Sequence, residues 1–351
     1  MPPSEARPSR NDGVAPGRRR RPVSAPTPLN KALRPALPPW LGAALAGLIG
    51  AGVPLQSRVN GELGAELGDP VLAAAISLLG GMAVLAVLAL TVPRVRRGVR
   101  QVPAAVRSRQ IHPGYLLAGS VGALFLLTQV ATVVLLGVAV FIVAVVAGQA
   151  LGGLGTDATG FAGHARRKPT PRRLLGAALV VLAVLLPAAT TGTGGGPALL
   201  LPAVIVVVVG VLTAFQHSAN ARVGSVVGSP LAATVLNFSV GTTLMVIATA
   251  VRLATTGLPQ EWPTDWWLYL GGIFGIVFIA GSAALIPHIG MLVMGLGSVA
   301  GQLAVSLLLD VLAPVSDAEV SGAMVAGTAL ALLAVAITTV PRRKPAVPDR
   351  S

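Results

Sequence analysis

The chain alternates between long apolar segments and short polar connections. Ten segments come close to the roughly 20 apolar residues that a helix needs to cross a bilayer. The predicted spans are 41–60, 71–92, 114–130, 132–152, 173–191, 199–219, 231–251, 266–286, 289–309 and 321–340. Spans three and four, and spans eight and nine, are joined so tightly that each pair predicts a helical hairpin, the second marked by Pro287 and His288. The pattern therefore predicts an all-α membrane protein with ten transmembrane helices.

Composition supports a lipid environment. Of 351 residues, 54% are hydrophobic and only 11% charged, and the mean hydropathy is +0.78. Soluble domains carry about 25% charged residues. The absence of cysteine excludes disulfides and thiolate chemistry. A net charge of +14 would indicate nucleic acid in a soluble protein, but here the charges lie in a few short segments. We therefore expect the lipid bilayer as a partner, and no nucleic acid.

The basic residues predict an orientation. Two tails and the second and fourth connections hold 23 of the 26 Lys and Arg residues. The second connection contributes Arg94, Arg96, Arg97, Arg100, Arg107 and Arg109. Ten spans place all four segments on one side, and basic loops mark the cytoplasmic side. We expect a multi-pass protein of the cytoplasmic membrane with both termini in the cytoplasm. The tail 1–39 reads as disordered, and either only enforces orientation or also contacts anionic lipid.

The chain contains an internal repeat. Gln56 and Asn60 recur as Gln216 and Asn220 at an offset of 160, together with the glycines and the proline that follow. A second block recurs at an offset of 153 and pairs Gly137 with Gly290, Gln149 with Gln302 and Asp157 with Asp310. The first copy therefore holds seven extra residues, which we place in the basic second connection.

The repeat predicts the domain organisation. A basic N-terminal tail (1–39) precedes two five-helix repeats (40–192 and 193–340) and a basic C-terminal tail (341–351). Because five is odd, the second copy enters the membrane from the opposite side, as in transporters that bind substrate near the midplane between inverted repeats. Glycines four residues apart predict close helix packing at 64 and 68, 148 and 152, and 297 and 301.

Amide side chains are the main candidates for a polar lining. Gln56 and Asn60 share a helix face, as do Gln216 and Asn220, and an amide facing lipid is costly. These four side chains either bind substrate or bond neighbouring helices. The asparagines also lie near predicted span ends, where they could cap the backbone. Gln149 and Gln302 occupy glycine-flanked helix interiors, and we expect them to face one another across a central cavity.

Titratable groups near the spans have two readings each. Asp157 and Asp310 lie at or just beyond span ends and are either coupling groups or solvated interfacial carboxylates. His217 and His288 could couple transport to protons, or simply pack and cap helices. Asp69-Pro70 and Ser229-Pro230 have the pattern of helix starts.

Enzyme chemistry finds no support in the sequence. The chain shows no paired carboxylates, nucleotide-binding glycine loop or nucleophile with its base. We therefore assign no catalytic residue, metal or cofactor, and expect no enzyme. Amides do not titrate, so we expect a neutral or zwitterionic polar substrate, or one with a polar head and an apolar body.

The repeated motifs resemble a known family. Gln-x3-Asn-x3-Gly-x3-Gly-x-Pro, from Gln56 and again from Gln216, with the later Gly-Gln and Asp, resembles the YdcZ-like family of the drug/metabolite transporter superfamily. The resemblance covers about 41 to 340. It implies an EamA-like architecture of ten helices in two inverted halves, cytoplasmic termini and secondary transport of small solutes. Small multidrug members of the superfamily exchange protons on a first-helix glutamate, whereas here the first span has no acidic residue before Glu62.

Three functions remain open from the sequence. The chain is a secondary transporter, a membrane scaffold or assembly protein, or a membrane-embedded enzyme of undefined chemistry. A monomer and a homodimer are both compatible with the sequence.

Overall fold

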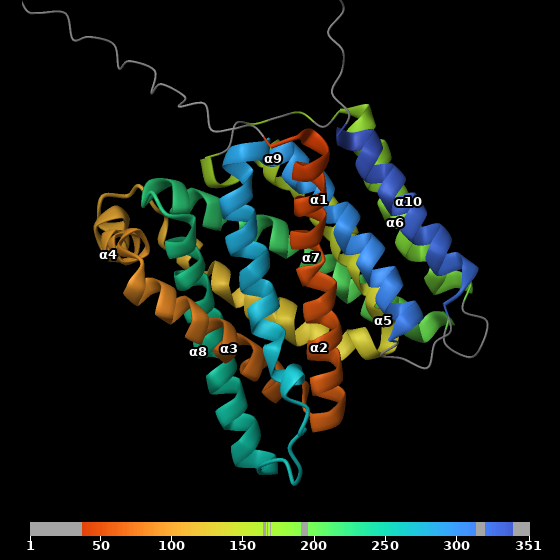
Figure 1. Ribbon diagram of the computed structural model, residues 1–351, viewed down its shortest axis with the longest axis horizontal. Coiled ribbons are helices and arrows are strands. Elements are labelled where there is room, and N and C mark those ends of the chain that lie inside the picture. Colours follow the sequence, from red (N-terminus) through yellow and green to blue (C-terminus); the bar gives the residue numbers. More distant parts are fainter. Residues whose placement is uncertain are drawn as a thin grey trace, which may run out of the picture. The chain divides into compact units, whose positions relative to one another are not determined.

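The computed structural model describes residues 37–163, 166, 168, 170–190, 196–313 and 320–339, and every regular element among them is helical (Figure 1). The α-helices are α1 (Pro39–Gly50), α2 (Gly52–Leu67), α3 (Pro70–Thr91), α4 (Pro93–Arg107), α5 (Gly119–Thr159), α6 (Pro171–Thr190), α7 (Gly196–Val226), α8 (Pro230–Thr256), α9 (Gly271–Leu312) and α10 (Gly322–Thr339). The 3-10 helices are η1 (Pro113–Ala118), η2 (Phe161–Gly163) and η3 (Trp266–Leu270). The basic tails predicted at 1–39 and 341–351 fall almost entirely outside the described residues, as does the predicted repeat boundary at 192–193.

Matched helix starts occupy the same place in both copies. The Asp69 carboxylate accepts hydrogen bonds from the Val71 and Leu72 N–H groups at the start of α3. The Ser229 hydroxyl accepts one from Ala232 N–H at the start of α8. Both predicted caps are confirmed. The prediction that Gly68 packs against a neighbouring helix was wrong. Gly68 has a left-handed backbone (φ 60°) just after α2 and no neighbour close to its Cβ position.

Helix α5 folds back on itself at Gly137. Gly137 has a non-helical backbone with φ 76° and ψ 162°, a conformation that glycine adopts without steric cost. Phe125 and Phe141 would lie about 24 Å apart along a straight helix, yet their ring centroids are 6.0 Å apart. The segments before and after Gly137 are therefore two helices joined by a sharp turn.

Helix α9 also folds back, as its contacts along α1 and α2 show. Its first half runs against that helix pair: Gly42 meets Ile289, Ile49 meets Gly281, and Gly52 meets Phe274. Its second half runs with the pair, from the Ala46–Gly297 contact to the bond between the Arg58 side chain and the Ala313 carbonyl. Figure 1 shows α9 rising beside α1 and turning back near the start of α1.

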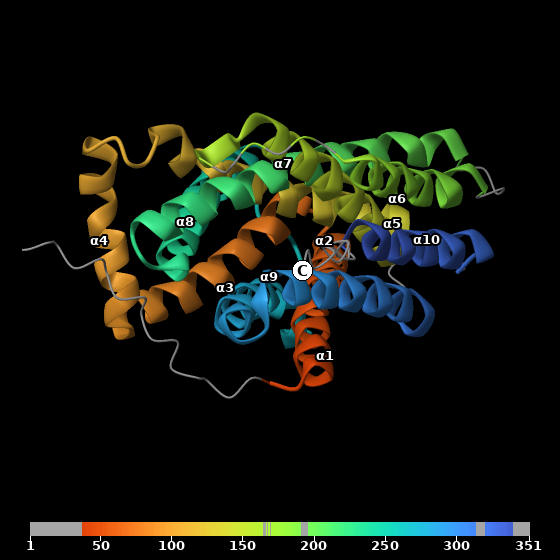
Figure 2. The same ribbon diagram turned by 90° about the horizontal axis from the view of Figure 1, so that it is seen from above.

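Matched positions of the two copies make matched contacts. A Cβ atom on Gly210 of α7 would lie 2.7 Å from the carbonyl oxygen of Val145 in α5. At the corresponding position of the first copy, a Cβ on Gly50 would collide with the carbonyl of Ser298 in α9. The first helix of each copy thus packs tightly against the fold-back helix of the other copy. The last helices of the copies, α6 and α10, lie side by side in both ribbon views (Figures 1 and 2).

The basic second connection is a helix, which corrects its prediction as a loop. In α4, Val95, Gly98, Val102 and Ala105 are buried, whereas the arginines are exposed. The hydropathy of this segment is too low for a membrane span, but its apolar residues recur at helical spacing on one face. Helix α4 packs mainly against α8 and α3.

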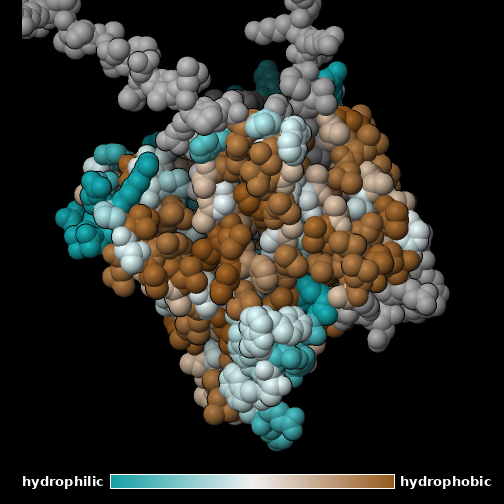
Figure 3. Space-filling model, in the orientation of Figure 1, coloured by the Kyte–Doolittle hydropathy of each residue, from teal (hydrophilic) through white to brown (hydrophobic). Residues whose placement is uncertain are grey.

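The surface suits a bilayer. Among the described residues, six helices are long and apolar enough to cross a membrane, and three further apolar helices are shorter. The six are Trp40–Leu67, Pro70–Thr91, Pro113–Thr159, Leu199–Val226, Pro230–Thr256 and Val293–Leu312. Large apolar side chains such as Leu90, Leu201 and Val251 are exposed. In Figure 3 hydrophobic surface covers most of the visible face, and hydrophilic residues gather at α4 and around the loop that follows α8.

Candidate functional site

Gln56 and Gln216 occupy equivalent, buried positions against the opposite copy. A Cβ on Gly275 of α9 would lie 3.1 Å from Gln56 Nε2, and a Cβ on Gly122 of α5 would lie 2.9 Å from Gln216 Nε2. Each side chain is 7% exposed. Each amide therefore fits against a glycine, where a larger residue would displace it. Gln216 Nε2 also donates to Asn237 Oδ1 at 3.0 Å.

The other predicted glutamines differ in their burial. Gln302 is buried and its Nε2 donates to Ser298 Oγ, one turn earlier in α9, at 3.1 Å. Gln149 is half-buried on α5. That these two side chains face one another across a cavity stays a prediction.

Asn60 belongs to a buried side-chain network. Its Nδ2 donates to Gln129 Oε1 at 2.8 Å, and Gln129 Nε2 donates to Ser57 Oγ at 2.7 Å. All three side chains are fully buried, and the network joins α2 to α5. The prediction that Asn60 lies near a span end was wrong, because α2 continues to Leu67. Ser57 and Asn60 lower the hydropathy of the sequence after Gln56, but both side chains are buried and hydrogen-bonded inside the protein.

Gln129 is a residue that sequence reasoning missed. It is fully buried on α5, and its counterpart at an offset of 153 is Ser282. The search for matched residues therefore passed over it. The signal available was a lone amide in an apolar helix, which must face protein.

The second copy lacks the same network. His217 stands where the first copy has Ser57, and Asn220 stands where it has Asn60. By the accessibility of their side chains, His217 is exposed and Asn220 is half-buried on α7. His288 is also exposed, with Nδ1 3.1 Å from the Ala284 carbonyl oxygen. The two copies thus share Gln56 and Gln216 but differ in the groups beside them.

Asp310 caps a helix of the other copy. Its Oδ1 accepts from Val138 N–H at 2.8 Å and its Oδ2 from Ala139 N–H at 2.7 Å. The side chain is 6% exposed, so a solvated interfacial carboxylate, one of the two predicted alternatives, is wrong for Asp310. Asp157 lies near the end of α5, and its role stays a prediction.

Three arginines that lie outside the basic segments contact carboxylate or carbonyl oxygens of other residues. Arg58 pairs with Glu62, and its Nε donates to the Ala313 carbonyl at 2.7 Å. Arg252 Nε lies 3.0 Å from Asp69 Oδ2, so α8 is tied to the start of α3. Arg222 Nη2 lies 3.4 Å from the Gln110 carbonyl. A charged side chain within a span is expected to be paired, and each of these three arginines contacts a carboxylate or a carbonyl oxygen.

In the part of the chain that the structure describes, no three His, Cys, Asp or Glu residues gather into a group that could hold a metal ion. The arrangement instead offers paired amides, tight helix crossings and charged groups near helix ends. These features, together with the six described helices that are long and apolar enough to cross a membrane, are those of a multi-pass membrane protein.

Comparison with protein families agrees with this class. Residues 41–186 and 201–337 match the family described as "Putative inner membrane exporter, YdcZ". The two matched ranges cover most of the chain and correspond to the two copies, so the chain belongs to this family. A search of curated proteins finds no match.

Proposed function

We propose that the protein is a secondary transporter that moves a small polar or amphipathic solute across the cytoplasmic membrane by alternating access. In this proposal, ten transmembrane segments form two inverted five-helix repeats. The fold-backs of α5 at Gly137 and of α9 near Ile289 support the count, because each divides one long element into two membrane segments.

One observation carries the proposal. The first helix of each copy packs on the other copy through matched positions, with Gln56 against Gly275 and Gln216 against Gly122. Two equivalent contacts of this kind allow one to loosen while the other tightens, which is the requirement of alternating access between repeats. The amides would supply hydrogen bonds to the solute at these contacts.

Transport in sealed vesicles tests the function. Purified protein is first screened against neutral and zwitterionic solutes for thermal stabilisation, since a ligand that binds the folded state raises its stability. Solutes that stabilise it are then followed into proteoliposomes. We expect flux with the wild type, a strong loss in Gln56→Ala and Gln216→Ala, and unchanged flux in Gln101→Ala, whose side chain is exposed on α4.

The scaffold alternative predicts a different result. A scaffold would give no protein-dependent flux of any stabilising solute, and the glutamine variants would behave like Gln101→Ala. Orientation is tested separately with a reporter fused at residue 345. Activity of that reporter only in the external compartment would contradict the ten-span arrangement.

A further inference from the structure

We propose that the outward face of α4 binds the headgroups of anionic phospholipids. Helix α4 begins at Pro93, two residues after α3 ends at Thr91, and α3 is long and apolar enough to cross the membrane. The chain turns at Val92, whose backbone is extended (φ −97°, ψ 107°). Helix α4 therefore starts where a membrane-spanning helix ends, at the level of the lipid headgroups.

The apolar face of α4 is already occupied by protein. Gly98 lies against Ala232 and Ser229, and a Cβ on Gly98 would be 2.7 Å from Ala232 Cβ. Val102 and Ala105 belong to a buried cluster with Val223 of α7. Arg94 Nε donates to the Gly228 carbonyl at 3.1 Å. The helix is thus fixed on the turn between α7 and α8 and does not need lipid tails to cover it.

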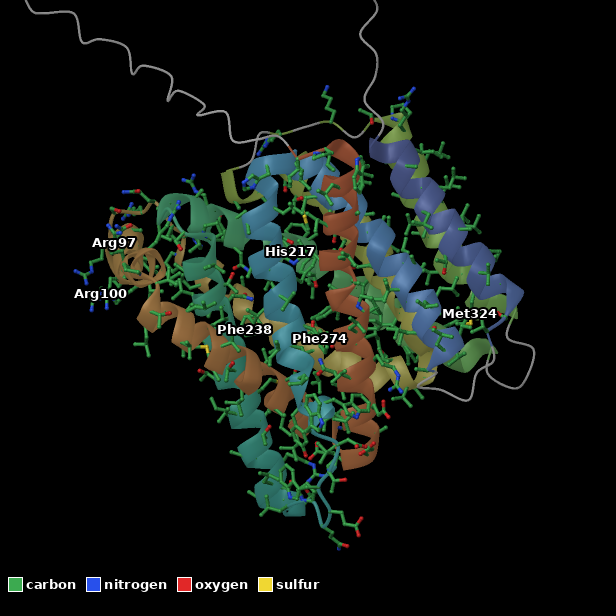
Figure 4. All side chains as sticks on the ribbon, in the orientation of Figure 1. Arg97, Arg100, His217, Phe238, Phe274 and Met324 are labelled. Atoms are coloured by element: carbon green, nitrogen blue, oxygen red, sulfur yellow. The ribbon has the colours of Figure 1, made fainter. Side chains whose placement is uncertain are left out.

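The opposite face carries unpaired positive charge. Arg96, Arg97, Arg100 and Arg107 fall on the side of the helix away from Val95 and Val102, and all four are exposed. Figure 4 shows Arg97 and Arg100 pointing away from the neighbouring helices. Residues 93–112 contain no Asp or Glu. Among the described residues no carboxylate forms an ion pair with an α4 arginine.

Charge complementarity identifies the occupant. Guanidinium groups bind phosphate through paired hydrogen bonds, and basic residues beside a membrane attract anionic lipid. The corresponding connection of the second copy, residues 257–265, contains Glu261 and Asp265 and no basic residue. The lipid site thus belongs to one copy and one membrane surface.

The test measures lipid binding without any transport assay. Purified protein is placed in nanodiscs of phosphatidylcholine in which the fraction of phosphatidylglycerol rises stepwise, and thermal unfolding is followed. We expect the unfolding midpoint to rise with phosphatidylglycerol and the rise to shrink in high salt, because salt screens exposed charges. Soluble glycerol phosphate at the same concentration should leave the midpoint unchanged, since it lacks the high local concentration of a membrane surface.

A matched pair of variants locates the site. The triple variant Arg96→Gln, Arg97→Gln, Arg100→Gln should lose most of the response. The triple variant Arg166→Gln, Lys168→Gln, Arg172→Gln removes the same charge from another basic connection and should keep it. An equal response in the two variants, or no effect of phosphatidylglycerol on the wild type, would overturn the proposal.

A second measurement on the wild type guards against a variant that fails to fold. Phosphatidylglycerol with a photoreactive headgroup should label the peptide 93–109 after irradiation. Labelling confined to other parts of the chain would contradict a site on α4.

Discussion

Asp310 in α9 holds the turn at Gly137 in α5, although 173 residues of sequence separate them. Both carboxylate oxygens accept backbone N–H groups, from Val138 at 2.8 Å and Ala139 at 2.7 Å. These N–H groups belong to the first residues of the second half of α5 and have no partner within their own helix. A carboxylate from one copy thus completes a helix start in the other copy.

Removing this cap should destabilise the protein. We expect Asp310→Ala to lower the free energy of unfolding by about 1–3 kcal/mol, because two buried N–H groups lose their acceptor. Asp310→Asn should cost less, since one carbonyl oxygen remains to accept. Thermal unfolding of the purified protein in detergent measures both variants. Asp265→Ala, at an exposed carboxylate that makes no cap bond to its helix, is the control and should change little.

The turn itself should require glycine. Gly137 has φ 76° and ψ 162°, a backbone region that is open essentially only to glycine, and a side chain there costs about 1–3 kcal/mol. A Cβ there would also lie 3.1 Å from Asp310 Oδ2. Gly137→Ala should therefore lower the unfolding midpoint. Gly153→Ala, in the same helix with open space around its Cβ position, should be neutral or stabilising. Equal effects of the two substitutions would argue against a strained turn.

The repeat predicts a second cap of the same kind. Asp157 and Gly290 match Asp310 and Gly137 at an offset of 153. We expect the Asp157 carboxylate to accept backbone N–H groups just after Gly290 in α9. Asp157→Ala should then destabilise the protein about as much as Asp310→Ala, and an experimental structure should show the bonds directly. An Asp157→Ala variant as stable as the wild type would show that the copies differ here.

The buried network around Gln129 should behave as a unit. Gln129→Ala leaves Asn60 Nδ2 without its acceptor, which costs about 1–3 kcal/mol. It also removes the N–H that Ser57 Oγ accepts, while Ser57 Oγ still donates to the Val53 carbonyl. Asn60→Ala should cost less when Gln129 is already absent, with a coupling energy of about 0.5–3 kcal/mol. Denaturation of the two single variants and the double variant measures this coupling. If the two destabilisations simply add in the double variant, the hydrogen bond between Asn60 and Gln129 contributes little to stability.

Much of the fold followed from the sequence because lipid makes hydropathy a strong signal. Matched motifs also identified the helix starts at Asp69 and Ser229, where local chemistry alone decides the structure. Asn60 shows where this reasoning stops. Its Nδ2 donates to Gln129, which is 69 residues away in the sequence, and no local pattern contains that information.

The prediction that the basic second connection is a loop was wrong for a related reason. Hydropathy averages over a window and reports α4 as polar, whereas Val95 and Val102 are buried on one face. Sequence patterns were also insufficient to predict every residue of the candidate site. Sequence matching found Gln56 and Gln216 but not Asn237, whose counterpart is Ser77, although Asn237 accepts a hydrogen bond from Gln216.

The last prediction concerns what drives transport. A buried carboxylate can exchange a proton for a cationic solute because both neutralise the same charge. The candidate lining instead consists of Gln56, Gln149, Gln216 and Gln302, and amides do not titrate. The buried carboxylate of Asp310 is occupied by two backbone N–H groups. We therefore expect transport to depend weakly on an imposed pH gradient at fixed voltage.

His217 and His288 are the groups that could change this result, because imidazole is a side chain that can gain and release a proton during a transport cycle. The measurement compares flux with and without a pH gradient in the wild type and in the double variant His217→Ala, His288→Ala. A gradient dependence that disappears in the double variant would assign coupling to the histidines. Strong dependence on the pH gradient that survives the double variant would contradict an amide-only mechanism. Asp157 would then be tested before Asp310. Protonation of Asp310 would weaken the cap at Gly137, so coupling through Asp310 should lower stability along with transport.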